Sequence, residues 1–192
     1  FGHPGQVPQI LTGFQIEAAA LWRGLSDQPA ELWWQSPDGS KVFLAYMRDS
    51  YSNGANLPTQ DAESFAQQIS IAGDSLALHS AANDHLIMLG TDHMEPSPNT
   101  SKVIAYANQH LAGKRVIHST MPAYLERIAG QIENMEEALP TIQGELRSCD
   151  RSPLLPGVLS TRMWIKQRNH HSQNLLEKWA EPFSVFAENI VA

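Results

Sequence analysis

Short apolar stretches alternate with amphipathic stretches over the first three quarters of the chain. The apolar stretches have the length of buried strands and occupy residues 16–22, 32–35, 41–46, 85–89, 116–118 and 141–146. Apolar residues recur at helical spacing within residues 59–76, 101–111 and 121–135. This alternation predicts an α/β fold, in which a mainly parallel sheet is flanked by helices.

Turn and cap residues refine this pattern. The sequence Ser-Pro-Asp-Gly at residues 36–39 is strong turn chemistry. We therefore expect the stretches 32–35 and 41–46 to pair as a hairpin. Thr59 is expected to cap the helix that follows, because a threonine side chain can accept a hydrogen bond from the first helical turn.

The pattern changes after Pro156 and Gly157. Residues 160–179 predict one long polar helix, Pro182 is expected to interrupt it, and residues 183–190 are expected to begin another. The predicted domains are the C-terminal part of an α/β domain followed by the start of a helical domain, at residues 1–150 and 151–192.

Composition narrows the class of protein. The chain has 192 residues, 42% of them apolar, so it can bury a core and is not expected to be disordered. Its net charge of −7 disfavours phosphate backbones, and we expect no nucleic-acid partner. No apolar run approaches the roughly 20 residues that span a bilayer, so we expect no membrane partner.

The cysteine count bears on the cellular compartment, and the first residues bear on whether the chain is a piece of a longer protein. The single cysteine, Cys149, excludes an internal disulfide framework and a four-cysteine zinc site. It fits a reducing compartment, and we expect a cytoplasmic protein. The chain starts at Phe1 without an initiator methionine or a signal stretch. We read it as a piece of a longer protein, called the parent below.

Asp92 is the first candidate for catalysis. It follows the predicted strand 85–89, and sites in parallel α/β sheets lie at the carboxyl ends of strands. A carboxyl group there can act as a general acid if burial or a neighbouring carboxylate raises its pKa. The same spacing also fits a turn or helix-cap aspartate near Pro96 and Pro98, and the spacing leaves both interpretations open.

Arg23 is the second candidate. It ends the predicted strand 16–22, where a guanidinium group could orient a catalytic carboxylate through two parallel hydrogen bonds. A surface ion pair is the alternative. The α/β pattern further predicts that Asp92 and Arg23 lie at the same edge of the sheet.

Histidines and aromatic residues are abundant but carry weaker signals. The eight histidines show no HExxH spacing and no cysteine partners, so spacing predicts no metal site. Five aromatic residues fit either a sugar-stacking platform or the core, namely Trp22, Trp33, Trp34, Tyr46 and Tyr51. Trp33 and Trp34 must point to opposite faces if they lie on one strand. Tyr51 lies in a polar loop, where contact with a ligand is expected.

These residues taken together resemble the family 38 glycoside hydrolases, which are retaining α-mannosidases, and in particular their bacterial branch. The matching segments keep their order and spacing over nearly the whole chain, at residues 1–3, 8–11, 21–24, 34–40, 89–92, 144–146, 156–162, 166 and 181–182. The resemblance implies a seven-stranded α/β catalytic domain followed by a helical middle domain. It also implies zinc-dependent, retaining cleavage of an α-mannoside substrate.

The resemblance carries over to four residues of this chain. Asp92 matches the general acid/base of the family, and Arg23 matches an arginine that holds the nucleophile. Phe1 matches an aromatic residue packed beside the sugar, and Tyr51 falls in a loop whose counterpart contacts substrate. The family nucleophile, which is also a zinc ligand, stands two residues before the position of Phe1.

The resemblance assigns no zinc ligand to this chain. The family's His-x-Asp ligands stand upstream of Phe1, and a further histidine shortly before Gly157 has no match here. The expected zinc therefore belongs to the parent. Two alternatives stay open, a hydrolase of a small mannoside such as mannosylglycerate, and a non-catalytic carbohydrate-binding piece.

Overall fold

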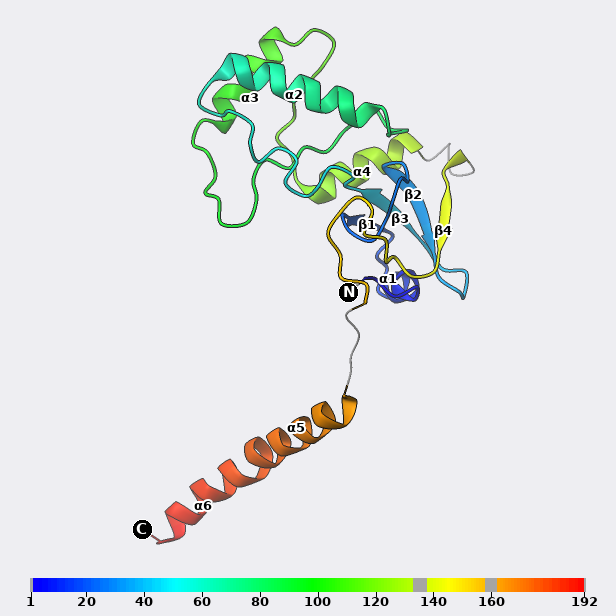
Figure 1. Cartoon of the computed structure of the whole chain (residues 1–192). Coiled ribbons are helices and arrows are strands. Elements are labelled where there is room, and N and C mark those ends of the chain that lie inside the picture. The colour runs from blue at the N-terminus through cyan, green and yellow to red at the C-terminus, as the bar shows by residue number, and fades with distance from the viewer. Residues whose placement is uncertain (1, 133–137, 158–161, 192) are drawn as a thin grey trace. The chain divides into compact units, whose positions relative to one another are not determined.

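The computed structural model describes residues 2–132, 138–157 and 162–191 (Figure 1). Contacts divide the chain into two compact units, with the division between Pro156 and Gly157. Within the described residues, no helix combines the length and the hydrophobicity needed to cross a bilayer.

The described part of the first unit contains a four-stranded sheet in the order β1-β3-β2-β4 (Figure 1). The strands are β1 (Ala18–Leu21), β2 (Glu31–Gln35), β3 (Lys41–Tyr46) and β4 (Thr141–Gln143). β1 pairs with β3 and β2 pairs with β4 in parallel, whereas β2 and β3 form the antiparallel hairpin that the turn at 36–39 predicts. The prediction of an α/β fold with a mainly parallel sheet is confirmed for these strands.

Helices cover both faces of this sheet. On one face, α1 (Val7–Gly13) packs on a cluster that contains Trp34; on the other, α4 (Met121–Ile132) packs on a cluster with Trp33 at its edge. The two neighbouring tryptophans thus point to opposite faces, as alternation along a strand requires. The largest buried strand side chains include Leu32, Val42 and Leu44. Each fully buried side chain of this kind contributes about 1.5–3 kcal/mol.

Two further helices pair with each other through a separate apolar cluster. They are α2 (Ala62–Ala77) and α3 (Thr100–His110), joined by Phe65, Ile69 and Val103. The expected cap of α2 at Thr59 is wrong. Asp61 caps the helix instead, because its Oδ1 accepts hydrogen bonds from the amides of Glu63 and Ser64 at 3.1 and 3.4 Å.

Two predicted strands are absent, although their residues lie in the described part of the chain. Residues 85–89 and 116–118 form neither helix nor strand and belong to no sheet. Side-chain amides take the place of a neighbouring strand. Asn53 bonds the backbone at Leu86 and Met88, and Asn108 bonds both backbone groups of Val116 at 2.7 and 2.9 Å. Both segments are apolar, as the sequence shows, but side chains and not strands bond their backbone.

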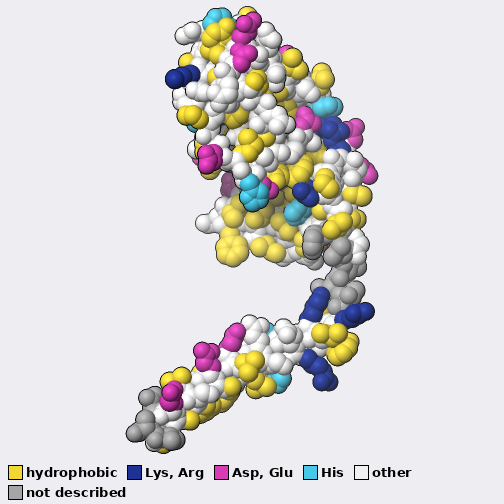
Figure 2. Space-filling model, turned by 60° about the vertical axis from the view of Figure 1, so that its left-hand side comes forward, with side chains coloured by type: hydrophobic (Ala, Val, Ile, Leu, Met, Phe, Trp, Pro, Cys, Tyr) yellow, Lys and Arg dark blue, Asp and Glu magenta, His cyan; other side chains and the backbone are white. Residues whose placement is uncertain are grey.

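The described residues of the second unit are helical from Met163 to Val191. α5 (Met163–Leu175) leads through a π-helical segment, Leu176–Ala180, into α6 (Glu181–Val191). Pro182 was expected to interrupt the helix, but the helix continues. Proline lacks the N–H that an α-helical turn needs, and the wider π-turns directly precede it. Large apolar side chains of this unit are exposed, among them Trp179, Phe183 and Phe186 (Figure 2).

Candidate active site

Tyr51 and Asp92 are joined directly. The Tyr51 hydroxyl donates a hydrogen bond to Oδ2 of Asp92 at 2.9 Å. Asp92 is exposed and Tyr51 is half-buried, so the pair is open to solvent on one side. Within the described residues, Oδ1 of Asp92 accepts no hydrogen bond. A carboxyl group held by one oxygen, with the other facing solvent, is oriented and still able to exchange a proton with a ligand.

Aromatic and cationic contacts extend this pair to Arg23. The Tyr51 ring meets the Trp22 ring edge-to-face, with 4.7 Å between ring centroids. The Arg23 guanidinium carbon lies 4.0 Å from the centroid of the same tryptophan ring, in a cation–π arrangement. Trp22 therefore lies between Arg23 and Tyr51, and the structure gathers Arg23, Tyr51 and Asp92 into one cluster. We call Trp22, Arg23, Tyr51 and Asp92 the acid cluster.

The backbone around Arg23 is fixed by a close approach to residues 146–148. Gly24 has φ +100°, and a Cβ there would lie 2.7 Å from the Leu146 carbonyl oxygen. The Ser148 amide donates to the Gly24 carbonyl at 3.1 Å. Arg23 itself donates from Nη1 to the Pro153 carbonyl at 2.6 Å. These contacts hold Arg23 just beyond the carboxyl end of β1.

Residues far apart in sequence also hold the segment that leads to Asp92. Asn53 bonds the backbone of residues 86 and 88 through its side chain, at 3.0 and 2.8 Å. The Gly54 amide adds a bond to the Met88 carbonyl at 3.0 Å. The loop that carries Tyr51 is therefore attached to the segment before Asp92 at a second place.

Asp92 influences the acidity of Tyr51. Its hydrogen bond with the tyrosine hydroxyl raises the pKa of Tyr51 above the ordinary value, because the phenolate would lose this bond. Partial desolvation and the charge of Asp92 act in the same direction, whereas Arg23 acts in the opposite one. Tyr51 therefore stays protonated, and able to donate to Asp92, over the physiological pH range.

The expected strand-end position is correct for Arg23 and wrong for Asp92. Arg23 follows β1, but residues 85–89 form no strand, so Asp92 is not at a strand end. Asp92 is joined to the rest of the acid cluster by its hydrogen bond with Tyr51. That loop begins where β3 ends, and the Met47 amide bonds the Leu21 carbonyl of β1 at 2.8 Å. Phe1, the fourth predicted site residue, lies outside the described residues.

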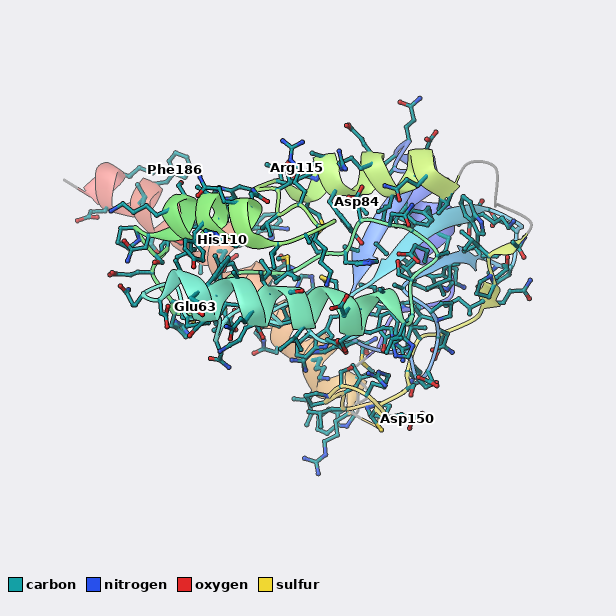
Figure 3. The ribbon with its side chains drawn as sticks, turned by 90° about the horizontal axis from the view of Figure 1, so that it is seen from above. Glu63, Asp84, His110, Arg115, Asp150 and Phe186 are labelled. Carbon is teal, nitrogen blue, oxygen red and sulfur yellow. The ribbon has the colours of Figure 1, made fainter. Side chains whose placement is uncertain are left out.

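The described residues do not assemble a metal site. No three His, Cys, Asp or Glu side chains among them lie close enough to share an ion. His110 and Asp84, both labelled in Figure 3, have other partners: the His110 ring stacks on the Tyr106 ring with 3.9 Å between centroids, and Asp84 pairs with Arg127 at 2.9 Å. His3 packs edge-on against Trp34, and burial lowers its pKa.

Sequence reasoning missed two members of this arrangement. Trp22 was grouped with the aromatic residues that could be core, yet it separates Arg23 from Tyr51. Asn53 is not among the candidates that the sequence selects. An asparagine before glycine in a polar loop is a signal for tight backbone contact, but nothing local identifies residues 86–88 as its partner.

Three comparisons with known proteins bear on the family of this chain. The model of the glycosyl hydrolases family 38 N-terminal domain matches residues 1–145. A protein of Halalkalibacterium halodurans, provisionally named mannosylglycerate hydrolase, is 31% identical over 205 residues, which cover 98% of this chain and 22% of that protein. The crystal structure of an alpha-mannosidase from Enterococcus faecalis V583 matches with a TM-score of 0.68 and 31% identity, over 76% of this chain and 17% of that one. The chain thus spans about a fifth of the length of these relatives.

Proposed function

The chain belongs to family 38 of the glycosyl hydrolases, and on this premise we propose that it supplies the acid/base part of the active site of a retaining α-mannosidase. The observation that carries the proposal is the fixed, solvent-facing Asp92 carboxyl group in the acid cluster. The function applies to the parent, because this chain covers about a fifth of its relatives.

In this proposal Asp92 transfers a proton twice. It protonates the glycosidic oxygen while a second carboxylate, from the parent upstream of Phe1, attacks the anomeric carbon. It then removes a proton from the water that releases the sugar. Retention requires the two carboxyl groups to stand about 5 Å apart. Tyr51, by donating to Oδ2, leaves Oδ1 as the atom that carries the proton.

Arg23 is proposed to orient the nucleophile. Its guanidinium group has five N–H donors, and Nη1 is bonded to the Pro153 carbonyl. The donors that remain can hold a carboxylate, and the Trp22 ring beneath the guanidinium group restricts its direction. Phe1 is proposed to pack beside the sugar, and Tyr51 to contact substrate in addition to Asp92.

The described residues of this chain do not provide a zinc site. The described residues offer no group of three ligands, and residues 150–157 contain no histidine. We therefore propose that zinc, which the family resemblance implies, is held by residues of the parent outside this chain.

The remainder of the parent is the proposed partner of this chain. β1 is an edge strand of the described sheet, and Phe14 and Ile16 just before it are exposed. A strand from the parent beside β1 would extend the four described strands toward the seven that the family resemblance implies. The apolar residues of α6 are likewise proposed to pack on further helices of a middle domain.

A small α-mannoside is the second candidate substrate. The relative from H. halodurans, provisionally named for mannosylglycerate, matches nearly the whole chain. An oligosaccharide and mannosylglycerate differ in the group that leaves, so the two candidates can be separated by comparing kcat/KM on both. The acid cluster has the same role with either substrate.

The test of the proposed function is hydrolysis by the parent. An aryl α-mannoside should release its leaving group, and NMR should find the α-anomer of mannose as the first product. A β-anomer would contradict retention, and no release from any α-mannoside would overturn the proposal. We also propose a cytoplasmic location, in keeping with the exposed free thiol of Cys149. Fractionation of the native host tests it.

A further inference from the structure

Asn53 and Gly54 connect two segments that are otherwise separate. The Asn53 side chain donates from Nδ2 to the Leu86 carbonyl at 3.0 Å, and its Oδ1 accepts from the Met88 amide at 2.8 Å. The Gly54 amide donates to the Met88 carbonyl at 3.0 Å. We call these three bonds the Asn53 clamp.

The clamp replaces a strand pairing. An asparagine side chain carries one donor group and one acceptor, so it can satisfy an extended backbone as a neighbouring strand would. The approach is close, since a Cβ on Gly54 would lie 2.7 Å from Ile87 Cγ2 and 2.9 Å from the Met88 carbonyl oxygen. Glycine is needed at residue 54 to allow this contact.

The clamped segment runs directly into Asp92. Met88 lies four residues before Asp92, and residues 89–95 are largely exposed. Few buried apolar contacts therefore fix this stretch, and its position depends on where its ends are held. The Tyr51 hydroxyl holds Asp92 itself, from a residue two positions before Asn53.

We propose that Asn53 is a positioning residue for the general acid, because it sets the distance between the Tyr51 loop and the segment that carries Asp92. This rests on the proposed function for its catalytic consequence, but the clamp can be tested without any activity. Within the described residues, the Asn53 side chain makes no hydrogen bond to Asp92. It acts through the backbone of residues 86–88.

The first experiment uses the 192-residue chain and NMR. In Asn53→Ala, the Met88 amide should exchange faster with solvent, and the pKa of Tyr51 should fall toward its ordinary value because Asp92 is no longer held against it. Asn56→Ala is the matched control, since Asn56 lies in the same loop, is exposed, and makes no side-chain hydrogen bond within the described residues. An unchanged Tyr51 titration in Asn53→Ala overturns the proposal.

The second experiment uses the parent and two α-mannosides, one with a good and one with a poor leaving group. kcat/KM reports the first step, which needs the acid only when the leaving group is poor. Asn53→Ala should lower kcat/KM by about 10–100-fold on the poor leaving group and little on the good one. Asn56→Ala should leave both unchanged. An equal loss on both substrates would mean that Asn53 only supports the fold.

Gly54→Ala provides a second variant in case Asn53→Ala folds poorly. It keeps the Asn53 side chain but forces the two segments apart, so the same selective loss is expected. A different result would overturn the proposed function: in the parent, Asp92→Asn would lower kcat/KM equally on the substrates with good and poor leaving groups. In that outcome the Tyr51 titration of the 192-residue chain still decides whether the clamp holds Asp92.

Discussion

The hydroxyl of Tyr51 bonds the carboxylate of Asp92 at 2.9 Å, across 41 positions of the sequence. The bond joins the loop after β3 to the loop after residues 85–89, which form no strand. It gives the proposed acid a fixed orientation, and it links Asp92 to Arg23 through the Trp22 ring.

Removing the carboxylate should change the titration of Tyr51. In Asp92→Ala, the pKa of Tyr51 is expected to fall toward its ordinary value, because the hydrogen bond to Asp92 is the main cause that raises it. Since the folded-state pKa is raised, the stabilisation from this bond is complete below about pH 10 and is lost as pH rises through the raised pKa. Labelled tyrosine followed by NMR measures the shift.

The matched control for this titration is Asp74→Ala. Asp74 lies on α2, and its carboxylate pairs with Lys114. It should leave Tyr51 unchanged. If Asp92→Ala leaves the Tyr51 titration where it was, the hydrogen bond does not form in solution.

Asp92→Asn in the parent should damage the two chemical steps unequally. Asparagine keeps the shape but cannot transfer the proton, so turnover of poor leaving groups should fall by about 10²–10⁴-fold. A good leaving group needs little protonation, so its glycosyl-enzyme should form and accumulate. Azide needs no base and should restore turnover, with an α-configured mannosyl azide as product. Near-normal activity of Asp92→Asn on natural mannosides would show that Asp92 is only a turn residue.

The 192-residue chain by itself should neither hydrolyse α-mannosides nor bind zinc tightly. It lacks the expected nucleophile, and its described residues offer no three-ligand group. Elemental analysis should find far less than one zinc per chain, and an aryl α-mannoside should stay intact. The parent, prepared in the same way, is the positive control. Stoichiometric zinc in the chain would contradict this prediction.

Gly24→Ala should destabilise the fold and displace Arg23. Its φ of +100° is strained for alanine, and the new Cβ would approach the Leu146 carbonyl oxygen to 2.7 Å. Gly39 has φ +91° but open space around its Cβ position, so Gly39→Ala isolates the strain, about 1–3 kcal/mol. Urea unfolding of the chain should show a larger loss for Gly24→Ala. Equal losses would mean that the contact with Leu146 relaxes.

Local patterns determined much of this protein. Proline and Asp-Gly between two apolar stretches suffice for the β2–β3 hairpin, because turn geometry is set by adjacent residues. Helical spacing suffices for α2, α3 and α4, since burial of one face repeats every turn. The ordered series of segments along the chain was enough to identify the family. Asp92, Arg23 and Tyr51 could be selected as candidates for the same reason.

Only the tertiary structure decided how these candidates meet. Residues 85–89 and 116–118 look like strands because they are short and apolar, but whether an extended segment joins a sheet depends on its hydrogen-bond partner. Here the partners are the side chains of Asn53 and Asn108, the first of which is 33 residues from the Leu86 carbonyl that it bonds. A partner so distant leaves no periodicity in the sequence. The clamp, the Trp22 ring between Arg23 and Tyr51, and the orientation of Asp92 are therefore properties of the folded chain, because each depends on a contact between residues that are far apart along it.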